Sequence, residues 1–305
     1  MPDVKSNRYL ALIRWFLLAA AYTYLAWKLW RFKEYDTLFS ILNAADWRSY
    51  TALAVALILM PLNLLTEAVR WRLLLSHLIP LNLTESIRQV TGGLTGAFLT
   101  PFRTGEIPAR LAYLQSGQVW KQALAAGLYG GVLMTLVITV IGIVPALSLL
   151  SAEQTSDVWL FALGTIALCT GGIAAMHKVA SRYDTWKCLH IPLLKTTLWT
   201  ATRYLCFTLQ FALMLYAVGI RLQPMEMMTA IPAYYLLVTL TPNMPAADAG
   251  IRGGWAVFVF SRFTDNYPLA AAAAIGMWII NTILPFCSLI LPKWQKKVCG
   301  TTIDK

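Results

Sequence analysis

Six apolar segments, each about as long as a membrane is thick, constrain the fold of this chain more than any other feature. A helix needs about 20 apolar residues to cross the hydrocarbon core of a bilayer. Charged residues make up only 13% of the 305 residues, about half the roughly 25% of a soluble domain. The sequence therefore predicts an all-α integral membrane protein with about six transmembrane helices, in a single membrane domain over residues 1–305. The six segments are 9–30, 49–69, 119–149, 158–176, 193–220 and 268–291.

Two further apolar runs, 87–100 and 227–241, are too short and too interrupted to be ordinary spans. Each stops at a proline, which removes an amide donor and disfavours helix at the residue before it. A second, semi-apolar piece follows each break, at 107–114 and 250–260. This pattern predicts two re-entrant helical hairpins. The helix-breaking residues are Pro101, Gly105, Pro242, Pro245 and Gly250.

The basic residues indicate the orientation of the spans. If both interrupted runs return to the side they entered from, most Lys and Arg residues fall on the side of the N-terminus, which the positive-inside rule makes cytoplasmic. We expect both termini in the cytoplasm and a location in the bacterial inner (plasma) membrane, with the first apolar run kept as a span. Residues 1–150 and 151–305 then have the same order of elements with opposite orientation. Such an inverted repeat is typical of secondary transporters.

The two breaks share a residue pattern. Each follows a Leu-Thr-Pro triplet and contains an acid four residues before an arginine, Glu106 with Arg110 and Asp248 with Arg252. Residues four apart share a helix face and can pair, and charges inside a membrane are costly enough to suggest a function. With Arg103 nearby, two helix starts and several guanidinium groups would suit a phosphate. The alternative is that the ion pairs only tether the hairpins.

Other polar residues lie within the spans. Arg203 would bind a lipid phosphate, neutralise Glu106 or Asp248, or extend towards the membrane surface. Asn63, Glu67 and Arg70 form a stripe at the end of the second span. We interpret that stripe as a polar network rather than a substrate contact.

Two stretches resemble a known family. Residues 70–75 read Arg-Trp-Arg-Leu-Leu-Leu and residues 101–110 contain Pro-x-Arg-x-Gly-Glu-x-x-x-Arg. Together they resemble the W-x-x-L-L … P-x-R-x-G-[DE]-x-x-x-R pattern of the lysylphosphatidylglycerol synthase transmembrane family, which is flippase-like. Residues 245–252, Pro-Ala-Ala-Asp-Ala-Gly-Ile-Arg, are similar to that family's P-x-x-G-G-x-G-x-R-E element. They depart from it at the paired glycines and at the acid after the arginine, where Gly253 stands.

The resemblance covers roughly residues 71–291 and implies a lipid-translocating module. Some relatives carry a fused aminoacyl-transferase domain; we expect none here and hence no lysyl transfer. The residues that match the family's motif positions are Arg103, Glu106, Arg110 and Arg252.

The leading functional hypothesis is a transporter or flippase for an anionic lipid or a lipid-linked, polyprenyl-phosphate type of substrate, held by its phosphate between the hairpin tips. One alternative is a non-transporting membrane subunit that binds a lipid or an enzyme of lipid or envelope synthesis. Another is a membrane-embedded lipid-phosphate transferase or phosphatase. We expect no enzyme activity, no cofactor and no metal site, because the cysteines form no C-x-x-C pair and the histidines no ligand set. Scattered basic residues argue against nucleic acid. The candidate substrate-binding residues are Arg103, Glu106, Arg110, Asp248, Arg252 and Arg203.

Overall fold

The computed structural model describes residues 46–100, 103–113, 119–150, 167, 192–241 and 248–283. Within these residues all regular structure is helical. The expected spans 9–30 and 158–176 lie outside the described residues, apart from residue 167, and so do both termini. The all-α prediction therefore holds for the described part of the chain.

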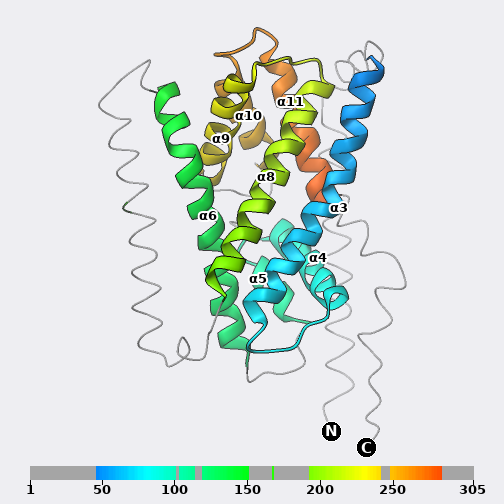
Figure 1. Cartoon of the computed structure of the whole chain (residues 1–305), viewed down its shortest axis with the longest axis vertical. Coiled ribbons are helices and arrows are strands. Elements are labelled where there is room, and N and C mark those ends of the chain that lie inside the picture. Colours follow the sequence, from blue (N-terminus) through cyan, green and yellow to red (C-terminus); the bar gives the residue numbers. More distant parts are fainter. Residues whose placement is uncertain are drawn as a thin grey trace, which may run out of the picture.

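Three long helices form the frame of the molecule (Figure 1). They are α3 (Trp47–Leu75), α6 (Trp120–Leu150) and α8 (Leu193–Ala217). Among the described residues, α3 and α6 are long and apolar enough to cross a membrane; at 1.5 Å per residue, the 29 residues of α3 extend about 43 Å. Helices α3 and α8 pack along each other, and α6 packs against α9 (Pro224–Leu240).

The long helices expose apolar side chains and bury polar ones. Leucine is exposed on all three helices and isoleucine and valine on α3 and α6, while charged and amide side chains are buried among the helices. A water-soluble protein reverses this arrangement for its charged residues, which are almost never fully buried. The exposed apolar residues include Val55, Ile58, Leu62, Leu128, Val140, Val144, Leu194, Leu198 and Leu205.

Shorter helices occupy the two ends of the frame. In Figure 1 the α4–α5 pair lies towards the lower end and the α9–α10 pair towards the upper end. Helix α11 packs against α10 and continues directly into a short π-helix, η3. The bounds of these elements are α4 (Leu83–Leu99), α5 (Glu106–Leu111), α10 (Asp248–Phe260), α11 (Tyr267–Trp278) and η3 (Ile279–Ile283).

Both expected breaks are present, with one correction. The first separates α4 from α5, with Gly105 at the N-cap of α5, and Pro101 lies outside the described residues. The second separates α9 from α10, and Pro242 and Pro245 also lie outside the described residues. The prediction of Gly250 as a helix breaker is wrong, because this residue lies in the first turn of α10. A single glycine costs a helix only about 1 kcal/mol, and the preceding helix α9 already ends at Leu240.

The first break is a tight turn. The Thr100 hydroxyl donates to the Gly96 carbonyl (2.8 Å) and accepts from the Gly105 amide (2.7 Å). A Cβ on Gly96 would lie 2.3 Å from the Gly105 carbonyl oxygen. Arg103, inside the turn, has a φ of 56°, a left-handed conformation that is uncommon for a residue other than glycine. The sequence thus brings α4 and α5 into backbone contact and presents Arg103 at their junction.

Candidate functional site

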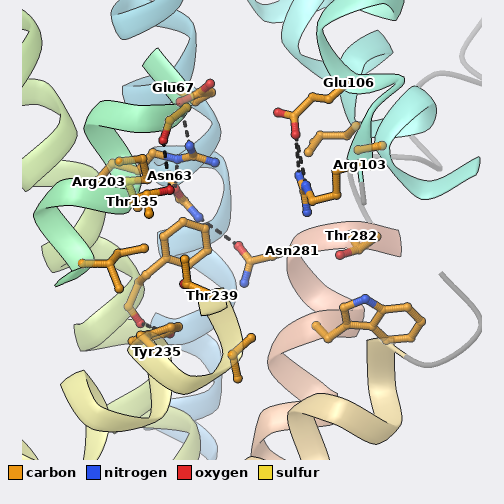
Figure 2. Close-up of a pocket in the computed structure, with 18 of the residues that line it drawn as sticks. Asn63, Glu67, Arg103, Glu106, Thr135, Arg203, Tyr235, Thr239, Asn281 and Thr282 are labelled. Atoms are coloured by element: carbon orange, nitrogen blue, oxygen red, sulfur yellow. Dashed lines mark hydrogen bonds and ion pairs between the residues drawn. The ribbon is translucent and has the colours of Figure 1, made fainter. Parts of the chain in front are cut away.

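A cavity of about 720 Å³ lies inside the helix frame and is lined by residues from both breaks. Thr100 and Arg103 come from the first break and Thr241 and Asp248 from the second. All the helices described above, and the π-helix η3, contribute other residues to the wall. Figure 2 shows polar side chains in two groups along it, Glu67 with Arg203 and Asn63 in one and Glu106 with Arg103 in the other.

Glu67 is the central acid of the site. Its carboxylate accepts two hydrogen bonds from Arg70, at 2.8 and 2.9 Å. It also pairs with Arg110 at 2.8 Å and with Arg203 at 2.7 Å. The Glu67 side chain is only 2% exposed. One buried carboxylate therefore joins arginines from α3, α5 and α8.

Glu106 links this cluster to the turn of the first break. It accepts hydrogen bonds from the Arg103 guanidinium at 2.9 and 3.0 Å and from Arg110. The Arg103 side chain is 42% exposed, whereas that of Arg110 is 5% exposed. The expected pair between Glu106 and Arg110 is thus present, and Arg110 bridges Glu106 and Glu67.

Arg110 itself lies behind the cavity wall. Its guanidinium stacks over the ring of Trp71, 4.9 Å from the ring centroid, and the Trp71 indole donates to Gln89 (2.7 Å). Arg110 is absent from the cavity lining, whereas Arg70, Arg103, Arg203 and Arg252 belong to it. Its position favours a structural role over direct contact with a ligand.

The acid–arginine pair of the second break is simpler. Arg252 donates to Asp248 at 2.6 Å, and the Trp278 indole donates to the other carboxylate oxygen of Asp248 at 2.8 Å. The Thr241 hydroxyl accepts from the Trp255 indole at 2.8 Å. The end of α9 is thereby fastened to α10, and the start of α10 to α11.

Arginines outnumber acids in this region. Four arginines and three acids line the cavity, and Arg110 stands directly behind it. Within the part of the chain that the structure describes, these five arginines and three acids leave a formal excess of two positive charges. Buried charges are tolerated only when paired, so the described residues leave room for an anion.

Three of these arginines keep donors for that anion. Arg103, Arg203 and Arg252 each hold a terminal guanidinium nitrogen that donates to no carboxylate of the described residues. Arg70 differs, because all three of its guanidinium nitrogens donate hydrogen bonds, to Glu67 or to the Gly130 carbonyl. The helix starts themselves offer less than expected, because Glu106 and Asp248 already occupy the first turns of α5 and α10.

A chain of amides continues from the charged cluster to the π-helix. Arg203 donates to the Asn63 carbonyl oxygen (3.3 Å), and the Asn63 amide donates to Asn281 (3.1 Å). Asn281 donates to Gln210 (2.9 Å), which donates to the Ala56 carbonyl (2.9 Å). The π-helical turn places both Asn281 and its neighbour Thr282 on the cavity wall, and such turns are frequent at functional sites.

The structure corrects the expected partner of Arg203. Of the acids considered for it, neither Glu106 nor Asp248 forms its ion pair; that pair is with Glu67, because α8 packs along α3. The predicted polar network of Asn63, Glu67 and Arg70 is confirmed, yet all three residues also line the cavity. The three residues therefore belong both to the polar network and to the cavity wall, although the sequence prediction assigned them to the network alone.

Several cavity residues were not singled out from the sequence. Asn281 and Thr282 gave a usable signal, because they form a polar pair inside the apolar segment 268–291. Thr135, Tyr235 and Trp278 gave none, since isolated hydroxyl and aromatic residues are common in membrane helices.

Comparison of the sequence with protein-family models and with curated proteins, and of the structure with solved structures, finds no match.

Proposed function

We propose that the chain is an integral membrane protein that moves an anionic lipid, a phospholipid or a polyprenyl-phosphate-linked molecule, from one leaflet to the other. The observation that carries the proposal is the excess of arginine around one cavity that both breaks line. A phosphate would neutralise that excess, and guanidinium groups are well suited to bind it. The acyl or prenyl tails would stay in the hydrocarbon.

The architecture we propose has about six transmembrane helices and two re-entrant hairpins, α4–α5 and α9–α10, related as an inverted repeat. The apolar exterior of the long helices supports lipid contact. The positions of the two helix pairs at opposite ends of the frame (Figure 1) support entry from opposite leaflets. A broken helix in a membrane needs partners for its free backbone groups, and the Thr100 hydroxyl supplies one to Gly105.

We further propose membership of the lysylphosphatidylglycerol synthase transmembrane family and a place in the bacterial inner membrane with cytoplasmic termini. The motif residues Arg103, Glu106 and Arg110 support this, because they interact with one another. A lipid-binding subunit that moves nothing would use the same cavity. A direct transport assay separates the two functions.

The assay uses purified protein in proteoliposomes with lipids labelled on an acyl chain. Anionic lipids should change leaflet faster than in protein-free vesicles, with or without an imposed proton or sodium gradient. Arg103→Gln should slow this movement at least tenfold while leaving the protein folded. The matched control is Arg48→Gln, at the exposed start of α3. Binding of lipid without any acceleration would favour the non-transporting subunit.

A further inference from the structure

We infer that the cavity selects a phosphate lipid whose headgroup is hydroxylated and carries no ammonium group. This inference rests on the proposed function and names the substrate class for the same site. It would set the chain apart from carriers of aminoacylated or ethanolamine lipids.

Among the described residues, every carboxylate that lines the cavity already accepts hydrogen bonds from the protein. Each oxygen of Glu67 lies within hydrogen-bonding distance of an arginine nitrogen. Both oxygens of Glu106 accept from Arg103 or Arg110. Those of Asp248 accept from Arg252 and Trp278. An ammonium group would have to displace one of these donors.

The charge that remains in the cavity is positive. The two uncompensated positive charges repel a cationic headgroup and attract a phosphate. The spare nitrogens of Arg103, Arg203 and Arg252 come from three different elements, the first break, α8 and α10. Positive charge therefore reaches the cavity from three different elements of its wall, which favours an anion inside it.

Two aromatic residues of the cavity wall already contact charged groups of the protein. The Phe207 ring already faces the Arg203 guanidinium, 5.3 Å from its centroid. The Trp278 indole is hydrogen-bonded to Asp248. An ammonium group on the Phe207 ring would have to displace the Arg203 guanidinium.

The cavity wall also carries neutral polar side chains. Thr135, Thr239, Thr282, Tyr235 and Asn281 line the cavity beside the charged cluster (Figure 2). Within the described residues, the hydroxyls of Thr239 and Thr282 make no hydrogen bond, whereas Tyr235 donates to the Phe207 carbonyl (3.0 Å). Hydroxyl and amide groups both donate and accept, so they match the hydroxyls of a glycerol or sugar headgroup.

The experiment compares four acyl-labelled lipids in the same proteoliposomes: phosphatidylglycerol, phosphatidic acid, phosphatidylethanolamine and lysyl-phosphatidylglycerol. Phosphatidylglycerol should move fastest, with both ammonium lipids at least tenfold slower and phosphatidic acid in between. Equal movement of either ammonium lipid would overturn the inference and leave the proposed function standing. Equal movement of phosphatidic acid would overturn the hydroxyl part. No acceleration of any lipid would instead remove the proposed function.

A soluble arm separates a lipid headgroup from free phosphate. Glycerol-phosphate and inorganic phosphate are added as competitors at equal concentration. Stronger inhibition by glycerol-phosphate supports a hydroxylated headgroup. Equal inhibition, together with uptake of inorganic phosphate into the vesicles, would overturn the inference in favour of a phosphate carrier.

A gain-of-function variant tests the charge argument. Thr239→Asp adds a carboxylate to the cavity wall and so lowers its excess of positive charge by one, and Thr239→Asn is its neutral control. The aspartate variant should raise the rate for phosphatidylethanolamine relative to phosphatidylglycerol at least threefold over the asparagine variant. An unchanged ratio in protein of native melting temperature would overturn the inference. If the aspartate variant does not fold, the four-lipid comparison with the native protein decides.

Discussion

The two breaks carry the same acid–arginine spacing but differ in what surrounds it. In the first break Glu106 accepts hydrogen bonds from Arg103 and Arg110. Arg110 also pairs with Glu67 on α3, and Glu67 pairs in turn with an arginine on α8. In the second break Asp248 accepts hydrogen bonds from one arginine, on α10, and from one indole, on α11. One pair belongs to a charged cluster that joins α3, α5 and α8, and the other is local to α10 and α11.

This difference shows that spacing alone does not define the role of an ion pair. Residues at i and i+4 on a helix meet in either case. Their role depends on whether another element supplies an additional charge, and at the first break Glu67 does so. The first break should therefore determine stability as well as binding, and the second should act mainly through Arg252 at the cavity.

Removing the central charge should have the largest effect. Glu67→Gln leaves three buried arginines without their shared carboxylate, and breaking a buried pair costs about 3–5 kcal/mol. We expect a loss at or near the top of that range in the free energy of unfolding. Asp248→Asn keeps an oxygen acceptor for Trp278 and should cost about 1–2 kcal/mol. Denaturant unfolding in detergent, followed by tryptophan fluorescence, measures both.

The control for these two variants is Asp265→Asn, at an exposed loop position, which should change stability by less than about 0.5 kcal/mol. Equal losses for Glu67→Gln and Asp248→Asn would mean that the two breaks are energetically equivalent, against the difference in their partners.

The two arginines of the first break should separate stability from transport. Arg110 is buried between Glu67, Glu106 and Trp71, so Arg110→Gln should cost about 3 kcal/mol. Arg103 is half exposed, and an exposed pair contributes less than about 1 kcal/mol. Arg103→Gln should therefore melt close to the native protein yet lose lipid movement. If Arg103→Gln unfolds as readily as Arg110→Gln, the ion pairs of the first break only tether the hairpin.

The sequence predicted the helices of the described region well because their signals are local. Apolar length placed α3, α6 and α8, and prolines placed the two breaks. The i, i+4 pairs were also predictable, since both partners lie on one helix. The role of Glu67 was not predictable from one segment, because its partners Arg110 and Arg203 lie 43 and 136 positions away in the sequence. Only the packing of α3 on α8 and of α5 nearby brings them together.

For Gly250, by contrast, a local signal gave a wrong prediction. A glycine after prolines favours a loop locally, but the helix of α10 already begins at Asp248. The sequence also did not distinguish a glycine in close contact with a neighbouring helix, such as Gly96, from one in open space.

That distinction yields a third test of the two breaks. A methyl group on Gly96 would overlap the Gly105 carbonyl, whereas one on Gly250 meets no described residue within 4 Å. Gly96→Ala should lower the free energy of unfolding by about 1–3 kcal/mol. Gly250→Ala should leave it unchanged or raise it by up to about 1 kcal/mol, because alanine favours helix. Thermal unfolding in one detergent gives both values, and a destabilised Gly250→Ala would indicate that the second break is as tightly packed as the first.

The smallest expected effects come from the threonines of the two Leu-Thr-Pro triplets, which bind in similar ways. Thr100 and Thr241 each donate to the carbonyl four residues back, at 2.8 and 2.7 Å, and each accepts from the segment after the break. The donor is the Gly105 amide in the first break and the Trp255 indole in the second. Thr100→Val leaves a backbone amide without its acceptor and should cost about 1–2 kcal/mol. Thr241→Val leaves only a partly exposed indole and should cost about 0.5–1 kcal/mol, because water can replace its acceptor. Valine keeps the shape of threonine, so the melting temperatures report the hydroxyl alone. A larger loss for Thr241→Val than for Thr100→Val would reverse the ranking of the two breaks that their ion pairs establish.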